Sequence, residues 1–228
     1  MALVQLEGVK KVYGQGDVQV HALRGVDLEI REGEFATVFG PSGSGKTTLL
    51  NLIGALDKPT RGTVRFEGAN TGEMNRNALA LLRRKNIGFI FQDYNLIPVL
   101  TAYENVEFAL QIANKNGRGS REQVTDILQS VGLEDVMHRR PNELSGGQKQ
   151  RVAVARALVK EPRLVLADEP TANLDSVTSR EVLEIMVRMN RELSTTFIFS
   201  THDPMVMEYA RRLLEIRDGT LSRDEGRE

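Results

Sequence analysis

The residues best suited to chemistry form a glycine-rich stretch that ends in Lys46 and Thr47. Glycines at this spacing let backbone N–H groups approach phosphate oxygens closely, and a following helix adds the positive end of its dipole. Lys46 can place its charge on the β and γ phosphates, and the Thr47 hydroxyl can bind Mg²⁺. The alternative is a plain glycine-rich turn, but the match to the P-loop pattern predicts a nucleotide phosphate site. Its expected members are Gly40, Pro41, Ser42, Gly43, Ser44, Gly45, Lys46, Thr47 and Thr48.

Two carboxylates follow a short apolar run, Leu164–Ala167, that reads as a buried strand. In open α/β sheets ligands bind beyond the carboxyl ends of strands, so Asp168 and Glu169 are placed to face a ligand. We expect Asp168 to hold Mg²⁺, directly or through water, and Glu169 to polarise an attacking water. Acidic pairs are also common at solvated strand ends, so this pair alone is a weak indication of a metal and catalytic site. It becomes a strong one in combination with the P-loop.

A second helix start is indicated where Leu144 is followed by Ser145, Gly146, Gly147 and Gln148. Ser145 is a good N-cap, and Gln148 completes a capping box. These residues could simply begin a helix. The paired glycines would also bare the helix N-terminus, which predicts another phosphate-facing helix start.

Composition limits the classes of protein that can carry these motifs. The 228 residues suffice for one large α/β domain with a buried core, and 40% of them are hydrophobic. Lys and Arg number 30 against 31 Asp and Glu, so charge offers no case for a nucleic-acid partner. The absence of cysteine excludes disulfides and thiolate chemistry. No apolar run approaches the ~18 residues of a membrane span, and the first residues read as a strand rather than a signal peptide.

The elements that must position the motifs alternate between strands and helices, which predicts a largely parallel sheet covered on both faces. The P-loop lies between an expected strand at 34–39 and an expected helix at 46–54. Other expected strands are 3–9, 20–30, 87–91, 164–167 and 196–200, with Gly14 and Gly16 turning between the first two and a closing hairpin of 212–216 and 220–221. Other expected helices begin near Ser145, span 176–193, and open at Asp203 and Pro204.

The stretch from about residue 101 to 131 has helical periodicity instead, interrupted by a glycine-rich break at 116–119. Ser120 and Gln123 have the spacing of a capping box, which predicts that Ser120 opens the second helix of this stretch. We interpret it as a helical lobe, residues 92–141, inserted into an α/β core of residues 1–91 and 142–228.

Taken together, the motifs resemble those of ATP-binding-cassette (ABC) ATPases, and the resemblance covers essentially the whole chain. Leu144–Gln148 is similar to the signature motif of this family, and Ala172–Asp175 is similar to its D-loop. The resemblance implies the P-loop fold of the family, with a mostly parallel core sheet, an antiparallel β subdomain and an inserted α-helical subdomain. It also implies ATP and Mg²⁺ as cofactors, and hydrolysis as the activity.

The same resemblance gives roles to residues that are uninformative singly. Tyr13 resembles the aromatic residue that stacks on adenine, Gln92 the glutamine that contacts Mg²⁺ and the attacking water, and His202 the histidine that contacts the γ phosphate. Asp175 joins the nucleotide-contacting set, and Glu169 becomes the general base. Taken alone, each has a structural alternative: a turn aromatic, a polar strand end, a residue preceding a helix cap, or a helix N-cap.

The family resemblance further implies a head-to-tail homodimer on ATP binding, with each ATP between the Lys46 loop of one subunit and Ser145–Gln148 of the other. Within the family, Ile87–Pro98 and Leu166–Ser176 are similar to the group of the MacB macrolide exporters and the lipoprotein-release ATPase LolD. This implies a permease partner of the MacB or LolC–E kind. It places the chain in the cytoplasm, on the inner face of the cell membrane, as a separate subunit or an excised cassette.

Two other functions compete with transport. One is an ABC ATPase of a non-transporting mechanotransmission complex, of the cell-division type, which shares this sequence signature. The other is a soluble ABC ATPase acting on DNA or ribosomes, for which tandem cassettes or basic extensions would be expected. The sequence also predicts a partner surface after Gln92, because its apolar residues follow no period that would bury them all. The expected groove residues are Tyr94, Leu96, Ile97, Leu100 and Tyr103.

Overall fold

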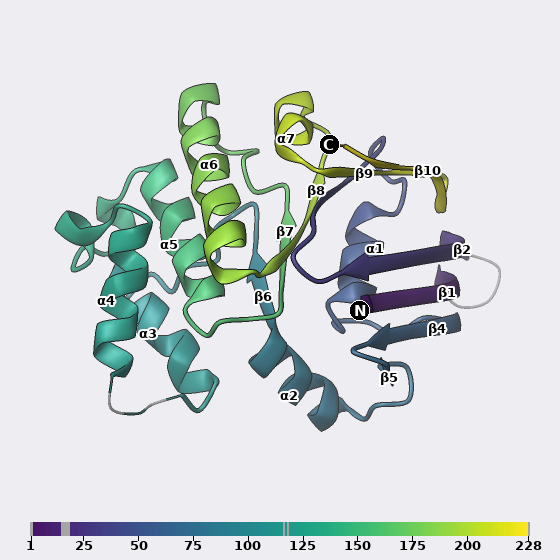
Figure 1. The fold of residues 1–228 in the computed structure, drawn as a ribbon, viewed down its shortest axis with the longest axis horizontal. Coiled ribbons are helices and arrows are strands. Elements are labelled where there is room, and N and C mark those ends of the chain that lie inside the picture. The colour runs from purple at the N-terminus through teal and green to yellow at the C-terminus, as the bar shows by residue number, and fades with distance from the viewer. Residues whose placement is uncertain (1, 15–18, 116, 118, 228) are drawn as a thin grey trace. The chain divides into compact units, whose positions relative to one another are not determined.

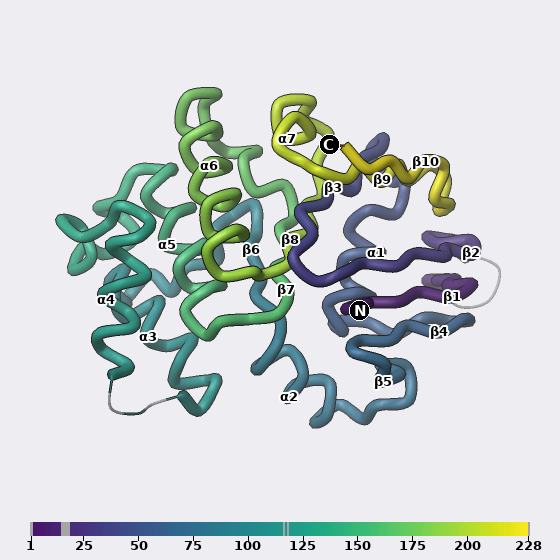
Figure 2. The backbone as a smooth tube through the Cα atoms, viewed as in Figure 1, coloured from purple at the N-terminus to yellow at the C-terminus, as the bar shows by residue number. Residues whose placement is uncertain are grey.

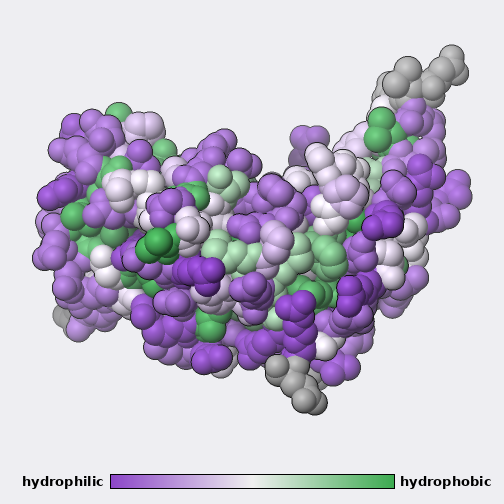
Figure 3. All heavy atoms as spheres, turned by 90° about the horizontal axis from the view of Figure 1, so that it is seen from above, coloured by the Kyte–Doolittle hydropathy of each residue, from purple (hydrophilic) through white to green (hydrophobic). Residues whose placement is uncertain are grey.

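The computed structural model describes residues 2–14, 19–115, 117 and 119–227. They form two compact units, one of residues 1–83 and 196–228 and one of residues 84–195. The expected turn glycine Gly16 and positions 116 and 118 of the glycine-rich break lie outside the described residues. Within the described ranges, no helix is long and apolar enough to cross a membrane. The face drawn in Figure 3 is mostly hydrophilic, with apolar residues in scattered patches. The division into a core and a lobe of residues 92–141 stays a prediction.

An antiparallel sheet in the first unit consists of β1 (Ala2–Tyr13), β2 (Val20–Arg31), β4 (Arg61–Phe66) and β5 (Ala69–Asn70), in the order β2-β1-β4-β5. Figure 1 shows β2, β1 and β4 side by side, with helix α1 (Lys46–Ile53) in the same unit. The strands expected at 3–9 and 20–30 are confirmed and longer than predicted, whereas β4 and β5 were not predicted. β4 pairs with β1 across more than fifty residues, whereas β5, only two residues long, pairs with β4 across the turn at Glu67 and Gly68.

The first unit also contains a set of mostly parallel strands. Strand β3 (Phe35–Phe39) pairs in parallel with β8 (Thr196–Thr201) and with β9 (Arg212–Arg217). β10 (Thr220–Gly226) closes the predicted hairpin against β9, and α7 (Pro204–Tyr209) follows β8. These strands agree with the predicted ranges to within a few residues at their ends.

Three phenylalanines fix the pairing of β3 and β8. The ring of Phe35 lies 4.6 Å from that of Phe199 and 5.6 Å from that of Phe197, centroid to centroid. All three side chains are at most 2% exposed, so a shift of register would break a tightly packed aromatic cluster.

The second unit contains the parallel pair β6 (Ile87–Ile90) and β7 (Leu164–Asp168) with most of the helices. Helix α5 (Gly146–Leu158) is its central element, because it packs against β6, α3, α4 and α6 and buries most of its residues. In Figure 1, helices α3, α4, α5 and α6 lie next to one another. Their bounds are α3 Ala102–Ile112, α4 Ser120–Ser130 and α6 Ser176–Leu193, with 3₁₀ turns at Glu134–Val136 and Pro141–Glu143; α2, Arg76–Asn86, was not predicted.

The helix predicted to open at Ser120 does begin there, but its predicted capping box is wrong. Ser120 is already inside α4, and the N-cap is Gly119, whose φ of 95° lies in the left-handed region. A chain entering through this conformation places Ser120 in the first turn, where its side chain makes no capping hydrogen bond. The capping box of this region lies at the start of α3 instead, where Thr101 accepts from the Glu104 N–H and the Glu104 carboxylate accepts from the Thr101 N–H.

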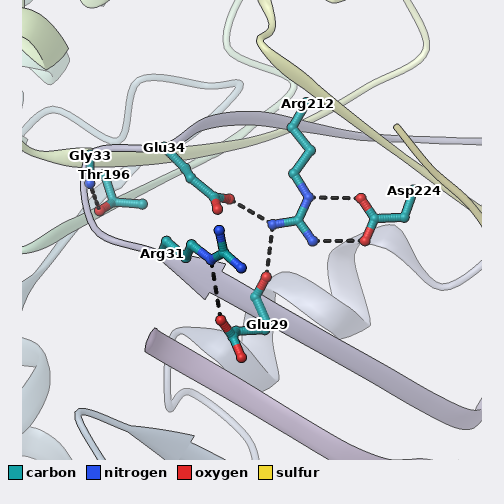
Figure 4. Close-up of polar contacts among 7 residues, drawn as sticks. All are labelled: Glu29, Arg31, Gly33, Glu34, Thr196, Arg212 and Asp224. Carbon is teal, nitrogen blue, oxygen red and sulfur yellow. Dashed lines mark hydrogen bonds and ion pairs between the residues drawn. The ribbon is translucent and has the colours of Figure 1, made fainter. Parts of the chain in front are cut away.

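A half-buried ion network ties together the strand ends of the first unit (Figure 4). The Arg212 guanidinium donates two hydrogen bonds of 2.7 Å to the Asp224 carboxylate, and a third of 2.8 Å to Glu34. A fourth, of 2.8 Å, reaches the backbone oxygen of Glu29. Hydrogen bonding to Asp224, and then to Glu34, raises the pKa of Arg212 above its ordinary value. One side chain therefore joins β9 to β10, to the start of β3 and to the end of β2.

We predict that Arg212→Met lowers the thermal midpoint of unfolding by roughly 3–6 °C, because it leaves the Asp224 carboxylate without its bidentate partner and Glu34 without its ion pair. Arg31→Met is the matched control. Its guanidinium forms an ion pair with Glu29 at 3.3 Å but is 73% exposed, so a shift near zero is expected. Calorimetry at two salt concentrations measures both, and equal shifts for the two variants would contradict a special role for Arg212.

Candidate active site

The P-loop adopts a conformation that only glycine permits at two positions. Gly40 has a φ of 149°, and a Cβ there would lie 2.0 Å from the Ile216 oxygen. Gly45 has a φ of 112°, and a Cβ there would lie 2.6 Å from the Ala22 oxygen. Strands β2 and β9 of the same unit thus pack closely against the loop. They leave no room for a side chain at Gly40 or Gly45, where the backbone turns.

Helix α1 begins directly from this loop without a side-chain cap. Its N-cap is Gly45, and its first turn contains no acidic residue, so the positive end of the helix dipole is not neutralised by its own sequence. The Lys46 ammonium donates to the Gly40 oxygen at 2.8 Å and to the Pro41 oxygen at 3.1 Å. The positive charge is therefore held over the loop, as an anion site requires.

Strand register brings His202 to the same sheet edge as the P-loop. Phe39 pairs with Thr201 at the ends of the parallel strands β3 and β8. The next residues, Gly40 and His202, therefore leave the sheet at the same level. The His202 side chain is exposed. The sequence predicted both residues as site members, and the structure brings them together.

Tyr13 is anchored by two residues that sequence reasoning missed. Its hydroxyl donates to the Asp57 carboxylate at 2.9 Å, and the Lys11 ammonium lies 4.8 Å from the ring centroid. Lys11 also forms an ion pair with Asp57 at 2.6 Å. Burial raises the pKa of Tyr13, so the phenol stays neutral at physiological pH. Asp57 lies shortly after α1, the helix that starts at the P-loop. The hydrogen bond from Tyr13 to Asp57 therefore links the aromatic ring to the P-loop through this helix.

The second unit repeats the same arrangement of parallel strand ends. Ile90 pairs with Ala167, so Gln92 and Glu169 follow at matched levels beyond β6 and β7. Asp168, the last residue of β7, is half-buried. Glu169 has a φ of 47°, a left-handed conformation that is costly for a residue with a side chain and is enriched at functional sites.

The N-terminus of α5 has the predicted capping box. Ser145 accepts from the Gln148 N–H at 3.3 Å, and the Gln148 side chain accepts from the Ser145 N–H at 2.9 Å. The glycines also have a packing role. A Cβ at Gly147 would lie 2.3 Å from the Thr178 methyl group, and one at Gly146 would lie 3.2 Å from the Tyr94 hydroxyl. Packing thus accounts for part of this motif independently of any ligand.

Asp175 is the N-cap of α6, the structural alternative considered for it. Its carboxylate accepts from the N–H groups of Val177 and Thr178, both at 3.0 Å. Hydrogen bonds from Thr178 lower the pKa of this carboxyl group. A nucleotide contact by Asp175 stays a prediction.

The predicted residues thus fall into one set in each unit. Tyr13, the P-loop and His202 belong to the first unit, and Gln92, Asp168, Glu169, Asp175 and the start of α5 belong to the second. Sequence reasoning missed Asp57, Lys11 and Arg156, and it placed Asn173 only within the stretch that resembles the D-loop. Arg156 donates to the oxygen of Tyr94, and Asn173 donates to the oxygen of Gln92. Their partners are backbone oxygens or distant side chains, which leave no sequence signal.

Comparison with known proteins identifies the family. The family described as "ABC transporter" matches residues 23–172. The chain is 45% identical over 228 residues to the macrolide export ATP-binding/permease protein MacB of Syntrophobacter fumaroxidans, covering 99% of this chain and 32% of that protein. It is 47% identical over 224 residues to the lipoprotein-releasing system ATP-binding protein LolD of Anaeromyxobacter dehalogenans, covering 97% of this chain and 93% of that one.

A solved structure supports the same assignment. The ATP-binding cassette MJ0796, in a dimeric post-hydrolysis state bound to ADP and Pi, superposes with a TM-score of 0.89 at 43% identity over 98% of both chains. The chain belongs to the ABC transporter family. It is an ATPase of that family, with the predicted P-loop fold. It spans about a third of the MacB relative and nearly all of the LolD relative.

We predict that Asp57→Ala raises the KM for ATP about three- to tenfold while leaving kcat nearly unchanged, because it frees the Tyr13 ring without touching the reacting groups. Tyr13→Phe, which removes only the hydroxyl that Asp57 accepts from, should give a smaller rise. Steady-state ATPase assays measure both. A fall in kcat at unchanged KM would contradict the anchoring role of Asp57.

Proposed function

We propose that this ATPase powers a membrane export or release machine by driving a permease similar to those of the MacB and LolD systems. It would work in the cytoplasm, at the inner face of the membrane, held there by the permease. The P-loop geometry carries the proposal of ATP binding. Similarity along nearly the whole chain to MacB and LolD relatives supports the assignment to their group.

The proposed reaction gives a role to each of the predicted catalytic residues. Lys46 binds the phosphates, while Glu169 accepts a proton from a water molecule whose oxygen attacks the γ phosphorus. The bond to the β–γ bridging oxygen breaks, giving ADP and phosphate. Gln92 orients the water, and His202 contacts the γ phosphate. Electrostatic stabilisation by Lys46 and by the start of α1 acts where negative charge develops.

The donor set fits magnesium. Among the residues that the structure describes, no group of three or more His, Cys, Asp or Glu side chains could hold a metal ion. Mg²⁺ in nucleotide sites needs no such group, because it keeps water and phosphate ligands and takes only one or two carboxylates from the protein. Thr47, Gln92 and Asp168 would supply hydroxyl, amide and carboxylate oxygens. The ion would neutralise phosphate charge during the reaction.

Two subunits would share each nucleotide. The P-loop of one chain binds the phosphates from one side, and Ser145, Gly146, Gly147 and Gln148 of a second copy would cover the other. The dimeric, ADP-bound relative supports this arrangement. The capping box leaves the N–H groups of the two glycines at the helix start, where the α5 dipole favours an anion.

We predict that Glu169→Gln retains ATP binding but lowers turnover at least a hundredfold, because an amide cannot accept the proton of water. The variant should accumulate as a dimer with Mg·ATP. Size-exclusion chromatography and phosphate release measure the two properties. The proposed base would be wrong if the variant hydrolysed ATP at the wild-type rate.

The surface proposed for the permease is partly exposed, as predicted. Leu96 and Ile97 are half-buried, and Val99 between them and α3 is 72% exposed. Buried Asn105 holds the segment in place: it donates to the oxygens of Ile97, Leu100 and Thr101, and accepts from the Ile97 N–H. The segment is therefore ordered by its backbone, which leaves its apolar side chains available to a partner.

A neighbouring hollow of about 240 Å³ adds to this surface and was missed by sequence reasoning. Its wall includes Phe89, Phe91 and Ile112, together with Arg156 and Lys160. Burial, and then the nearby charge of Lys115, lower the pKa of Lys160 to about 8. An apolar hollow with cationic side chains suits an amphipathic permease segment that brings a carboxylate.

We predict that Leu96→Asp or Ile97→Asp leaves the ATPase rate of the isolated chain within about twofold, while binding to membranes that contain the permease falls at least tenfold. Leu193→Asp, at a 41% exposed position on α6, is the control and should bind normally. Sedimentation with membranes stripped of the native subunit measures binding. If the two variants bind normally, or if they unfold, then Leu96 and Ile97 serve to pack the lobe and do not dock the permease.

A further inference from the structure

The chain immediately after Gln92 is held in a costly conformation. Tyr94 and Asn95 have φ values of 61° and 48°, both in the left-handed region although neither is glycine. The left-handed region is unfavourable for Tyr94 and better tolerated by Asn95, so contacts from elsewhere must stabilise the pair. Local bonds contribute, since the Tyr94 N–H donates to the Phe91 oxygen at 3.1 Å.

Arg156, on the last turn of α5, supplies one external anchor. Its guanidinium donates to the Tyr94 oxygen at 2.6 Å and to the Asn95 oxygen. Burial lowers the pKa of Arg156, so its charge is partly removed from water. Both donated bonds go to backbone oxygens rather than to carboxylates, and they fix the two residues that carry the backbone strain.

Asn173 supplies a second anchor, closer to the chemistry. Its side-chain amide donates to the backbone oxygen of Gln92 at 3.0 Å and to the Asp93 carboxylate at 3.2 Å. Asn173 lies in the loop between β7 and α6, four residues after Glu169. That loop is itself ordered, because the Ala172 N–H donates to the Glu169 oxygen at 3.2 Å and Asp175 caps α6.

The two loops therefore leave neighbouring strands at matched levels and are then tied together by one amide group. Strands β6 and β7 lie side by side (Figure 2). Their pairing of Ile90 with Ala167 sets the starting level of the two loops, and the Asn173 amide sets the separation beyond it. All of these atoms belong to the second unit. A displacement of the loop after β7 must act directly on the backbone of Gln92.

We propose that Asn173 is a positioning residue that sets Gln92 relative to Glu169, with Arg156 as a second anchor of the same segment. The proposal rests on the proposed roles of Gln92 and Glu169 in hydrolysis. Asn173 is not among the residues assigned to the nucleotide, and it sits apart in sequence from the P-loop. Its loss should therefore slow the chemical step and leave ATP affinity intact.

The first test is Asn173→Ala, compared with Asn142→Ala, an exposed asparagine in the same unit. We expect kcat to fall about tenfold for the Asn173 variant, with KM and the dissociation constant for a fluorescent ATP analogue within twofold of wild type. Thermal unfolding should shift by no more than a few degrees. Unchanged kcat, or a loss of activity matched by unfolding, would overturn the proposal.

A second test exchanges the hydrogen-bonding partners. Asn173→Asp cannot donate when ionised and faces the Asp93 carboxylate, so kcat should fall at least as far as in the alanine variant. Adding Asp93→Asn to that variant restores a donor opposite the introduced carboxylate, and part of the lost kcat should return. The double variant restores the bond between positions 173 and 93 but not the bond to the Gln92 oxygen. No recovery would therefore refute a positioning role for the Asn173–Asp93 bond, even if the alanine variant is too unstable to assay.

Glu169→Gln separates this inference from the proposed function. If that variant hydrolyses ATP normally, the proposed base is wrong and the function proposal fails with it. If Glu169→Gln is inactive while Asn173→Ala and Asn173→Asp are fully active, the site assignment stands and only the positioning role of Asn173 is refuted.

Discussion

Parallel strand pairing is the constraint on which the candidate site depends. In each unit, a buried pair of parallel strands ends at a common level, so the loops that follow start side by side. The register is fixed by packing: by the aromatic cluster of β3 and β8 in one unit, and in the other by Gly88, where a Cβ would lie 2.7 Å from the Ala157 oxygen of α5. A slip of one residue would turn every side chain of the strand to the opposite face and separate residues that must act together.

The two helix starts near the chemistry are built differently. Helix α1 begins on a bare glycine, whereas α5 begins on Ser145 and Gln148, which use each other's backbone N–H groups. A capped helix start stays ordered without a ligand, while an uncapped one gains most of its partners from an anion. The difference suits a loop that encloses phosphates and a second helix start that must be preformed when another molecule meets it.

Much of the architecture could be predicted from the sequence because its signals are local. The P-loop, the Ser145 cap, the bounds of α6 and the closing hairpin follow from residue types within a few positions. Strand β4 was missed because it pairs with the distant β1, and β5 because two residues are too few to show an alternating pattern. Helix α2 was missed because it buries only Leu79 and Leu82, two positions that alone do not define a helical period. The cap at Ser120 was wrong because Gly119 takes the left-handed conformation first. Asp57, Arg156 and Asn173 act through contacts made by folding alone, so their roles become visible only in three dimensions.

Helix α5 carries a mechanical consequence. Its 13 residues start at the capping box of Ser145, and Arg156 stands near its other end, about 15 Å along the axis. A helix of this length, buried against β6 and three other helices, moves as a rigid body. A displacement of the Ser145 end would therefore move Arg156 and the carbonyl oxygens of Tyr94 and Asn95 to which it donates. No change in secondary structure would be needed between the two ends.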